Sequence, residues 1–171
     1  MDCDYNKRKN GACNGGLPLW AFKYYMNGAA QGMTESDYPY KEKKGTCMYS
    51  QKKATNMMVV SQGTPKSNSV ASMQKALTIQ PVSVGVDASK TNFSLYKSGV
   101  FDGRCGTDLD HATLVVGYGT DKSTGQDFWI MKNSWGNTWG EKGYMRLLQN
   151  GDGPGQCGIQ NDNNFVTTGS A

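Results

Sequence analysis

The spacing of apolar residues predicts one longer helix near the start of the chain. Residues 1–16 and 32–56 have no regular spacing and are rich in turn formers, so we expect loops there. Between them, apolar side chains recur at the i, i+3, i+4, i+7 spacing of one helix face: Leu17, Trp20, Ala21 and Tyr24. Pro18 suits the first turn of this helix, and Gly28 marks its expected end.

The rest of the chain has the pattern of a β-rich half. The run Ser67-Asn68-Ser69 can cap a short helix that turns Val70, Met73 and Leu77 inward. Segments of strand length follow, separated by turns rich in Gly, Asp and Asn. We expect antiparallel strands in a barrel-like arrangement over residues 82–86, 112–118, 128–132 and 144–148, with a further strand at 57–61.

Composition fits one globular domain and excludes several classes of function. The chain has 171 residues, 37% of them hydrophobic, with four Trp, nine Tyr and five Phe, which is enough for a core. No apolar run approaches the roughly 20 residues of a membrane span. The formal charge is +4, but the basic clusters at residues 7–9 and 41–44 lie among turn formers. We therefore interpret both as solvated loops and expect neither nucleic acid nor membrane as a partner.

The cysteines favour disulfides over a metal. There are five of them, at positions 3, 13, 47, 105 and 157, and no two form a C-x-x-C pair. With a single His in the chain, we expect no metal site and no cofactor. Wide spacing in a turn-rich chain indicates an oxidising compartment, and the odd number leaves one thiol free or paired outside this chain.

Three local clusters contain residues that could carry chemistry. They are Cys13-Asn14-Gly15-Gly16, then Asp110-His111-Ala112 at the start of a strand, then Asn133-Ser134-Trp135-Gly136. Taken singly, a lone His is more often structural, an Asn before Ser-Trp-Gly is a turn residue, and a Trp belongs to a core.

Taken together and in order, these clusters resemble the papain-like cysteine peptidases, the family of papain and cathepsin L. The resemblance extends over nearly the whole chain. Further segments that fit the family's motifs are Asp2-Cys3-Asp4, Tyr38-Pro39-Tyr40, Gln80-Pro81-Val82-Ser83-Val84 and Cys157-Gly158-Ile159.

The resemblance implies a cysteine-type endopeptidase with an α+β, two-lobed fold. Residues 1–60 would be what remains of the helical lobe, and residues 61–171 the β-barrel-like lobe. His111 would stabilise a thiolate and protonate the leaving amine, and Asn133 would orient its ring. Trp135 would cover the bond between them, where a lower local dielectric strengthens it.

The chain departs from the family pattern in one respect. The family's nucleophilic Cys lies in a Gly-Ser-Cys-Trp type of motif roughly 130–150 residues before its His, so we expect it about 20–40 residues before Met1. The family's oxyanion glutamine is also expected upstream. Cys13 lies in Ala-Cys-Asn-Gly, which is not that motif. We therefore expect an N-terminally truncated fragment that is inactive alone.

The resemblance also implies a disulfide pairing and a substrate site. Cys3 would pair with Cys47 and Cys105 with Cys157, which leaves Cys13 for a Cys of the missing segment. Gly15 and Gly16 would pair with an extended substrate, and Asp110 would supply backbone beside the scissile bond. The main specificity pocket would be formed by Leu17, Pro18, Gly85, Leu109 and Asp162.

The implied partners are a peptide or protein substrate, the missing N-terminal segment and protein inhibitors of the cystatin type. The implied location is lysosomal, vacuolar or secreted. Two alternatives stay open. One is a catalytically dead papain-like protein with a binding or structural role. The other is an unrelated secreted domain, which predicts that Cys13 pairs within this chain.

Overall fold

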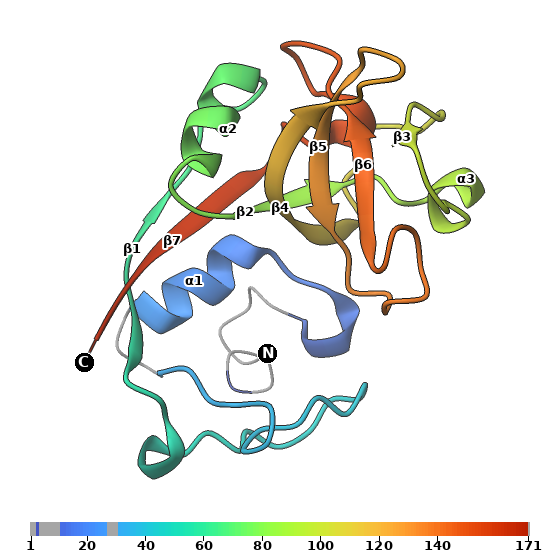
Figure 1. The fold of residues 1–171 in the computed structure, drawn as a ribbon. Helices are drawn as coiled ribbons and strands as arrows, with labels where there is room; N and C mark the ends of the chain where they lie inside the picture. The colour runs from blue at the N-terminus through green and yellow to red at the C-terminus, as the bar shows by residue number, and fades with distance from the viewer. Residues whose placement is uncertain (1–2, 4–10, 27–30, 171) are drawn as a thin grey trace. The chain divides into compact units, whose positions relative to one another are not determined.

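A computed structural model describes residue 3, residues 11–26 and residues 31–170 (Figure 1). The expected helix end at Gly28 and the basic cluster at residues 7–9 lie outside these ranges. The helices are α1 (Pro18–Met26), α2 (Val70–Leu77) and α3 (Thr91–Ser94), with 3₁₀ turns at Ala12–Asn14, Gln51–Lys53 and Gln156–Gly158. The strands are β1 (Met57–Gly63), β2 (Val82–Val86), β3 (Val100–Phe101), β4 (His111–Thr120), β5 (Asp127–Lys132), β6 (Tyr144–Leu148) and β7 (Asn163–Ser170).

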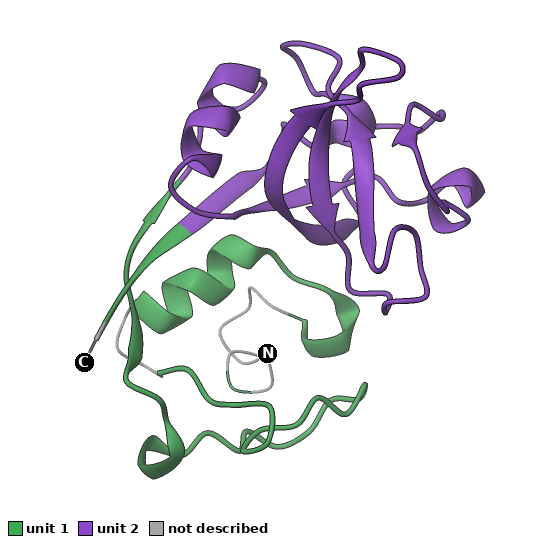
Figure 2. Ribbon diagram, viewed as in Figure 1, with its two compact units in different colours: residues 1–63, 166–171 green, residues 64–165 purple. Residues whose placement is uncertain are grey.

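The chain divides into two compact units (Figure 2). Unit 1 consists of residues 1–63 and 166–171, and its regular elements are α1, β1 and the end of β7. Unit 2 consists of residues 64–165 and contains the remaining strands with α2 and α3. His111 and Asn133 both belong to unit 2.

The sheet has the strand order β1-β7-β2-β4-β5-β6-β3. The pairs β2–β4, β4–β5 and β5–β6 are antiparallel, as the sequence predicts. The short strand β3 is different, because it runs parallel to β6, with Val100 opposite Arg146. A register shift between Val115 and Gly117 bends β4 against β5.

Local signals explain where the elements of unit 2 begin. Of the three residues expected to cap α2, Ser69 does so, because its side chain accepts a hydrogen bond from Ser72 N at 3.4 Å. Pro81 cannot donate a backbone hydrogen bond, and β2 starts directly after it. Along β2 the residues Val82, Val84 and Val86 are fully buried, with less buried residues between them.

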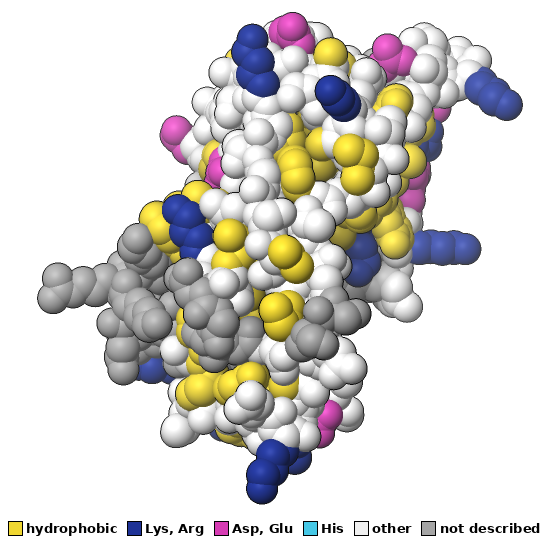
Figure 3. All heavy atoms as spheres, turned by 90° about the vertical axis from the view of Figure 1, so that its left-hand side faces the viewer, with side chains coloured by type: hydrophobic (Ala, Val, Ile, Leu, Met, Phe, Trp, Pro, Cys, Tyr) yellow, Lys and Arg dark blue, Asp and Glu magenta, His cyan; other side chains and the backbone are white. Residues whose placement is uncertain are grey.

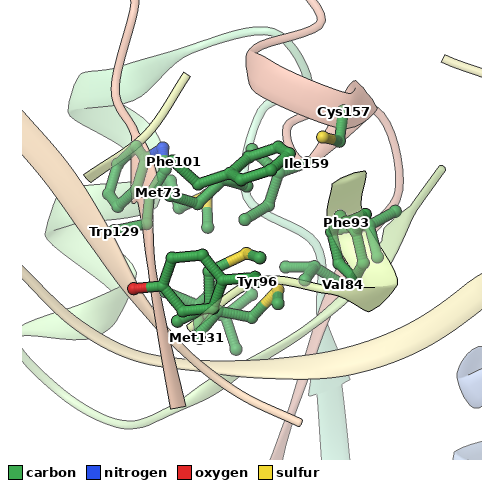
Figure 4. Packing of buried hydrophobic residues seen from close by; sticks show 14 of the residues in the cluster. Met73, Val84, Phe93, Tyr96, Phe101, Trp129, Met131, Cys157 and Ile159 are labelled. Atoms are coloured by element: carbon green, nitrogen blue, oxygen red, sulfur yellow. The ribbon is translucent and has the colours of Figure 1, made fainter. Parts of the chain in front are cut away.

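The core lies in unit 2, between the sheet and the helices that contact it. Figure 4 shows Trp129, Met131 and Tyr96 with Phe93 and Ile159 in this cluster. Tyr96 is 5% exposed, and the other four side chains are completely buried. Since α3 contributes Phe93, this four-residue helix is fixed to the core by one large aromatic side chain.

The apolar face of α1 is not buried within the described residues. No residue of α1 is fully buried, and Leu17, which precedes it, is 48% exposed. On β1, Met57, Met58 and Val60 are exposed as well. Figure 3 shows hydrophobic side chains reaching the surface, and Lys and Arg side chains spread over this face of the molecule.

Residues 41–44 form an exposed loop. Among the described residues, no helix is long and apolar enough to cross a membrane.

Two disulfides join the cysteines that the resemblance paired. Cys3 is bonded to Cys47 in unit 1, and Cys105 to Cys157 in unit 2, while Cys13 is free and exposed. The pairing of Cys13 within the chain, which an unrelated disulfide-stapled domain would require, is therefore not found.

Peptide mapping under non-reducing conditions should recover Cys3 linked to Cys47 and Cys105 linked to Cys157. Only Cys13 should react with iodoacetamide before reduction. Each bridge closes a loop of 44 or 52 residues, which in the loop-entropy model stabilises the fold by about 4 kcal/mol. A peptide that links Cys13 to another cysteine of this chain would contradict the structure.

Candidate active site

Three neighbouring strands bring His111 and Asn133 together. His111 begins β4 and lies opposite Val86, the last residue of β2. Asn133 directly follows β5, and its N–H donates to Gly143 O at 2.9 Å across the β5–β6 loop. Because β4 and β5 are antiparallel, the start of β4 lies beside the end of β5. The two residues are 22 positions apart in sequence, and their side chains meet through this pairing.

A hydrogen bond of 2.8 Å joins His111 Nε2 and Asn133 Oδ1. Ser134 N is 2.7 Å from the same oxygen. A backbone N–H can only donate, so the atom of Asn133 that faces it must be the oxygen of the amide. The oxygen accepts both bonds, and His111 must therefore donate to it from Nε2.

This arrangement leaves the other ring nitrogen available. In the neutral ring, a proton on Nε2 makes Nδ1 an acceptor. Asn133 is 8% exposed, so water competes little for its oxygen. Within the described residues, Asn133 Nδ2 is buried and has no hydrogen-bond partner. The site can thus hold an imidazole in one tautomer and present one basic nitrogen.

Trp135 lies on the His111 ring. The two ring centroids are 4.9 Å apart and the planes are inclined by 27°, which is a stacked arrangement. The contact excludes water from one face of the imidazole. The sequence-based interpretation expected Trp135 to cover the His111–Asn133 bond, and the contact observed is with the His111 ring.

Asp110 and Asp87 hold the segment that leads into His111. Asp110 Oδ1 accepts from Ala88 N at 2.8 Å, and Asp110 N donates to Val86 O at 3.1 Å. The Asp87 carboxylate is 3% exposed and accepts from the Ser89 hydroxyl at 2.6 Å and from Ser89 N at 3.1 Å. These bonds, led by the Ser89 hydroxyl, hold the pKa of Asp87 below its usual range. A buried anion is therefore stabilised beside the strand that carries the histidine.

Three of the predicted pocket residues are neighbours in unit 2. Gly85 N donates to Asp162 O at 3.0 Å. A Cβ at Gly85 would lie 2.9 Å from Leu109 Cδ1, so the Leu109 side chain would have to shift to make room for it. The Asp162 carboxylate accepts from Asn164 Nδ2 at 2.7 Å.

The other predicted substrate residues belong to unit 1: Gly15, Gly16, Leu17 and Pro18. Gly15 has φ +92°, a conformation that favours glycine, and an added Cβ would meet nothing within 4 Å. Glycine at this position is therefore explained by its positive φ angle and not by a lack of room for a side chain.

No group of three or more His, Cys, Asp or Glu residues suited to a metal occurs among the residues that the structure describes.

The comparisons with known proteins identify the family of the chain. Residues 1–167 match the model of the papain family cysteine proteases. The chain belongs to the papain family. Among curated relatives in Arabidopsis thaliana, it is 48% identical over 161 residues to the probable cysteine protease RD21B and 46% identical over 169 residues to the cysteine protease XCP2. These matches cover 93% and 98% of this chain, but 34% and 46% of the relatives.

Solved papain-family structures have the same fold. The bromelain protease from Ananas comosus, solved with an inhibitor, is 39% identical with a TM-score of 0.86. The ragweed allergen Amb a 11, solved as its proform, is 35% identical with a TM-score of 0.87. The matches cover 93% and 96% of this chain, and 73% and 48% of those chains. The papain-like α+β fold expected from the sequence is confirmed, and the chain corresponds to a C-terminal part of the family domain.

The sequence-based interpretation missed the support beneath Trp135. Trp135 packs edge-on against Trp139 at 5.3 Å and against Phe93 at 5.8 Å. Trp139 Nε1 donates to Ser94 O at 2.9 Å. Both tryptophans lie in the turn segment between β5 and β6, where sequence spacing does not predict which side chains meet, and the sequence has no feature that connects either of them to α3.

Replacing Trp135 with Ala should expose the His111–Asn133 hydrogen bond to water. A stacked aromatic pair contributes about 0.5–1.5 kcal/mol, so solvent exchange of His111 Nε2–H should become roughly two- to tenfold faster. The line width of the downfield imidazole proton resonance measures this rate. Tyr118→Ala is the matched control, because Tyr118 lies on β4, the strand that begins with His111, and is 42% exposed, close to the 39% of Trp135. An unchanged rate in Trp135→Ala would show that the indole does not shield the bond.

Proposed function

We propose that this chain carries the histidine and asparagine of a cysteine endopeptidase that hydrolyses peptide bonds through a Cys-His-Asn site. The observation that supports this most strongly is the 2.8 Å bond from His111 Nε2 to Asn133 Oδ1, which leaves Nδ1 as the acceptor. Membership of a family of cysteine proteases supports the same reaction class.

In this reaction the proton moves between sulfur and Nδ1. The thiol of the nucleophile transfers its proton to His111 Nδ1, and the resulting imidazolium stabilises the thiolate. The thiolate then attacks the substrate carbonyl carbon, and the tetrahedral intermediate expels the amine as His111 returns the proton to it, which leaves a thioester. Water then attacks the thioester and gives a proton to His111 Nδ1, and that proton passes to the departing sulfur, so that the acid is released and the thiol is restored. Asn133 accepts the Nε2–H bond throughout and keeps the ring in place.

The attacking thiol is proposed to come from outside this chain. Of the five cysteines, four form the two disulfides and the fifth, Cys13, belongs to unit 1. Its Ala-Cys-Asn-Gly context differs from the Gly-Ser-Cys-Trp type of motif. Loss of one oxyanion donor costs roughly 100–1,000-fold in rate, and the oxyanion glutamine is also proposed to lie upstream. The chain alone should therefore be inactive.

The proposed substrate is an extended peptide with an apolar residue two positions before the cut. Gly85 and Leu109 supply apolar surface in unit 2. That Leu17 and Pro18 also contact this side chain is proposed from the family resemblance alone. Burial of a Leu or Phe side chain contributes ~1.5–3 kcal/mol. Gly15 and Gly16 are assigned to the substrate backbone.

Partners and location follow from the same assignment. Relatives of known structure include an inhibitor complex and a proform, and we propose a preceding N-terminal segment and cystatin-type inhibitors as partners of the whole protein. Two disulfides suit an oxidising lysosomal, vacuolar or extracellular compartment. The intact His111–Asn133 pair favours the peptidase over a catalytically dead relative.

Activity should require the upstream segment. We expect the purified chain not to hydrolyse dipeptidyl fluorogenic substrates. A fusion to the corresponding N-terminal segment of the 48% identical RD21B relative should hydrolyse them, and His111→Ala in that fusion should abolish turnover. Cys13→Ser in the chain alone is the control. Turnover by the chain alone that disappears in Cys13→Ser would refute the assignment of the nucleophile.

Asp162 should let the active fusion accept Arg in the proposed pocket. A carboxylate can form a charge-assisted bond with an incoming guanidinium. We expect Asp162→Ala to lower the Arg-to-Leu ratio of kcat/KM at the second residue before the cut by roughly tenfold, equivalent to about 1.4 kcal/mol. Asp102→Ala, an exposed carboxylate of the same unit, is the matched control. The same ratio in Asp162→Ala and the unmodified fusion would make Asp162 an ordinary loop residue.

A further inference from the structure

Trp135 lies on the His111 ring without being buried itself. Its side chain is 39% exposed. Burial holds a partly exposed indole less firmly than a core residue, so its position depends on the rings that it rests on. Those rings are Phe93, which is completely buried, and Trp139, which is 9% exposed. The place of Trp135 is therefore set by how well Trp139 is held.

Trp139 is fixed by the loop that follows it. Gly143 N donates to Trp139 O at 2.7 Å, and Glu141 N donates to Tyr144 O at 2.9 Å. These two bonds close a tight loop at the start of β6. A displacement of Glu141 would therefore move the backbone that holds Trp139.

Glu141 is in turn held by Arg146 of β6. Arg146 Nη2 donates to Glu141 Oε1 at 2.7 Å and Nε donates to Oε2 at 3.0 Å, so that two parallel bonds form. Arg146 is held from its other side, because Nη1 donates to Asp121 Oδ2 at 2.7 Å. The bonds from Arg146 hold the pKa of Glu141 below its usual range. The side chains are 28% and 29% exposed, so the pair is better shielded than an ion pair in open solvent.

The ion pair also contacts the segment that carries the aromatic rings. Glu141 Oε1 accepts from Gly99 N at 2.9 Å. The Tyr96 hydroxyl donates to Gly99 O at 2.7 Å and accepts from Arg146 N at 3.2 Å. The Tyr96 ring packs on Trp139 at 5.6 Å. Glu141 and Arg146 thus reach Trp139 by two routes, through the loop backbone and through Tyr96.

We propose that the Glu141–Arg146 pair is a positioning element that holds Trp135 against His111, acting through Trp139 and Tyr96. Neither charged residue touches the histidine. The consequence for catalysis rests on the proposed function of His111, but the placement of the indole does not.

The single His of the chain gives this proposal a direct test. The Hε1 proton of His111 gives one NMR resonance, and the stacked Trp135 ring shifts it by its ring current. Trp135→Ala in the full chain defines the shift of an unstacked ring. We expect Arg146→Met and Glu141→Ala to move the Hε1 resonance most of the way toward that value. Asp127→Asn is the matched control, because this carboxylate is on neighbouring β5 and accepts from Thr120 Oγ1 at 2.6 Å. It should leave the resonance unchanged.

A merely stabilising ion pair would give a different result. If Arg146→Met and Glu141→Ala remain folded by circular dichroism and keep the wild-type Hε1 shift, the proposal is wrong. If neither variant folds, the milder Arg146→Lys decides, since lysine keeps the charge but cannot form the two parallel bonds. The proposal then requires a displacement in the direction of Trp135→Ala, and an unchanged shift overturns it. Either failure would leave the His111–Asn133 bond and the activity of the fusion untouched, so it is distinguishable from failure of the proposed function.

Discussion

The hydrogen bond from His111 Nε2 to Asn133 Oδ1 is the interaction on which the proposed chemistry depends. An imidazole can carry its proton on either nitrogen, and only one choice leaves Nδ1 as the base. The oxygen of Asn133 makes that choice, and Ser134 N fixes the amide so that the oxygen faces the ring. One backbone N–H therefore determines which ring nitrogen can receive a proton.

The strand pairing and the aromatic cluster serve this bond in different ways. Pairing of β4 with β2 and β5 brings the two side chains within reach. The cluster of Trp135, Trp139 and Phe93 lowers the local dielectric on one side of the imidazole, and this strengthens the bond. A sheet alone would place the residues, but it would leave their hydrogen bond in competition with water.

The sequence predicted the parts of the fold that have local signals. Strands β2 and β6 have the expected bounds, and α2 begins after one of the three residues expected to cap it, Ser69. Pro81 marks the start of β2. Strand β7 was missed, since its polar sequence Asn-Asn-Phe-Val-Thr-Thr-Gly-Ser has no alternation. Strand β3 was missed because two residues are too few for a periodic pattern. His111 and Asn133 could be predicted from their sequence motifs. The contacts of Arg146 with Glu141 and Tyr96 could not, because they form only when β5 and β6 pair.

The tautomer of His111 tests the central claim most directly. The two ring nitrogens have distinct ¹⁵N chemical shifts when one is protonated and the other is not, and a long-range ¹H–¹⁵N correlation spectrum of the full chain assigns them. We predict that the neutral ring is protonated at Nε2, and that Asn133→Ala converts it to a mixture of both forms. A wild-type ring protonated at Nδ1, or an equal mixture that Asn133→Ala does not change, would contradict the account.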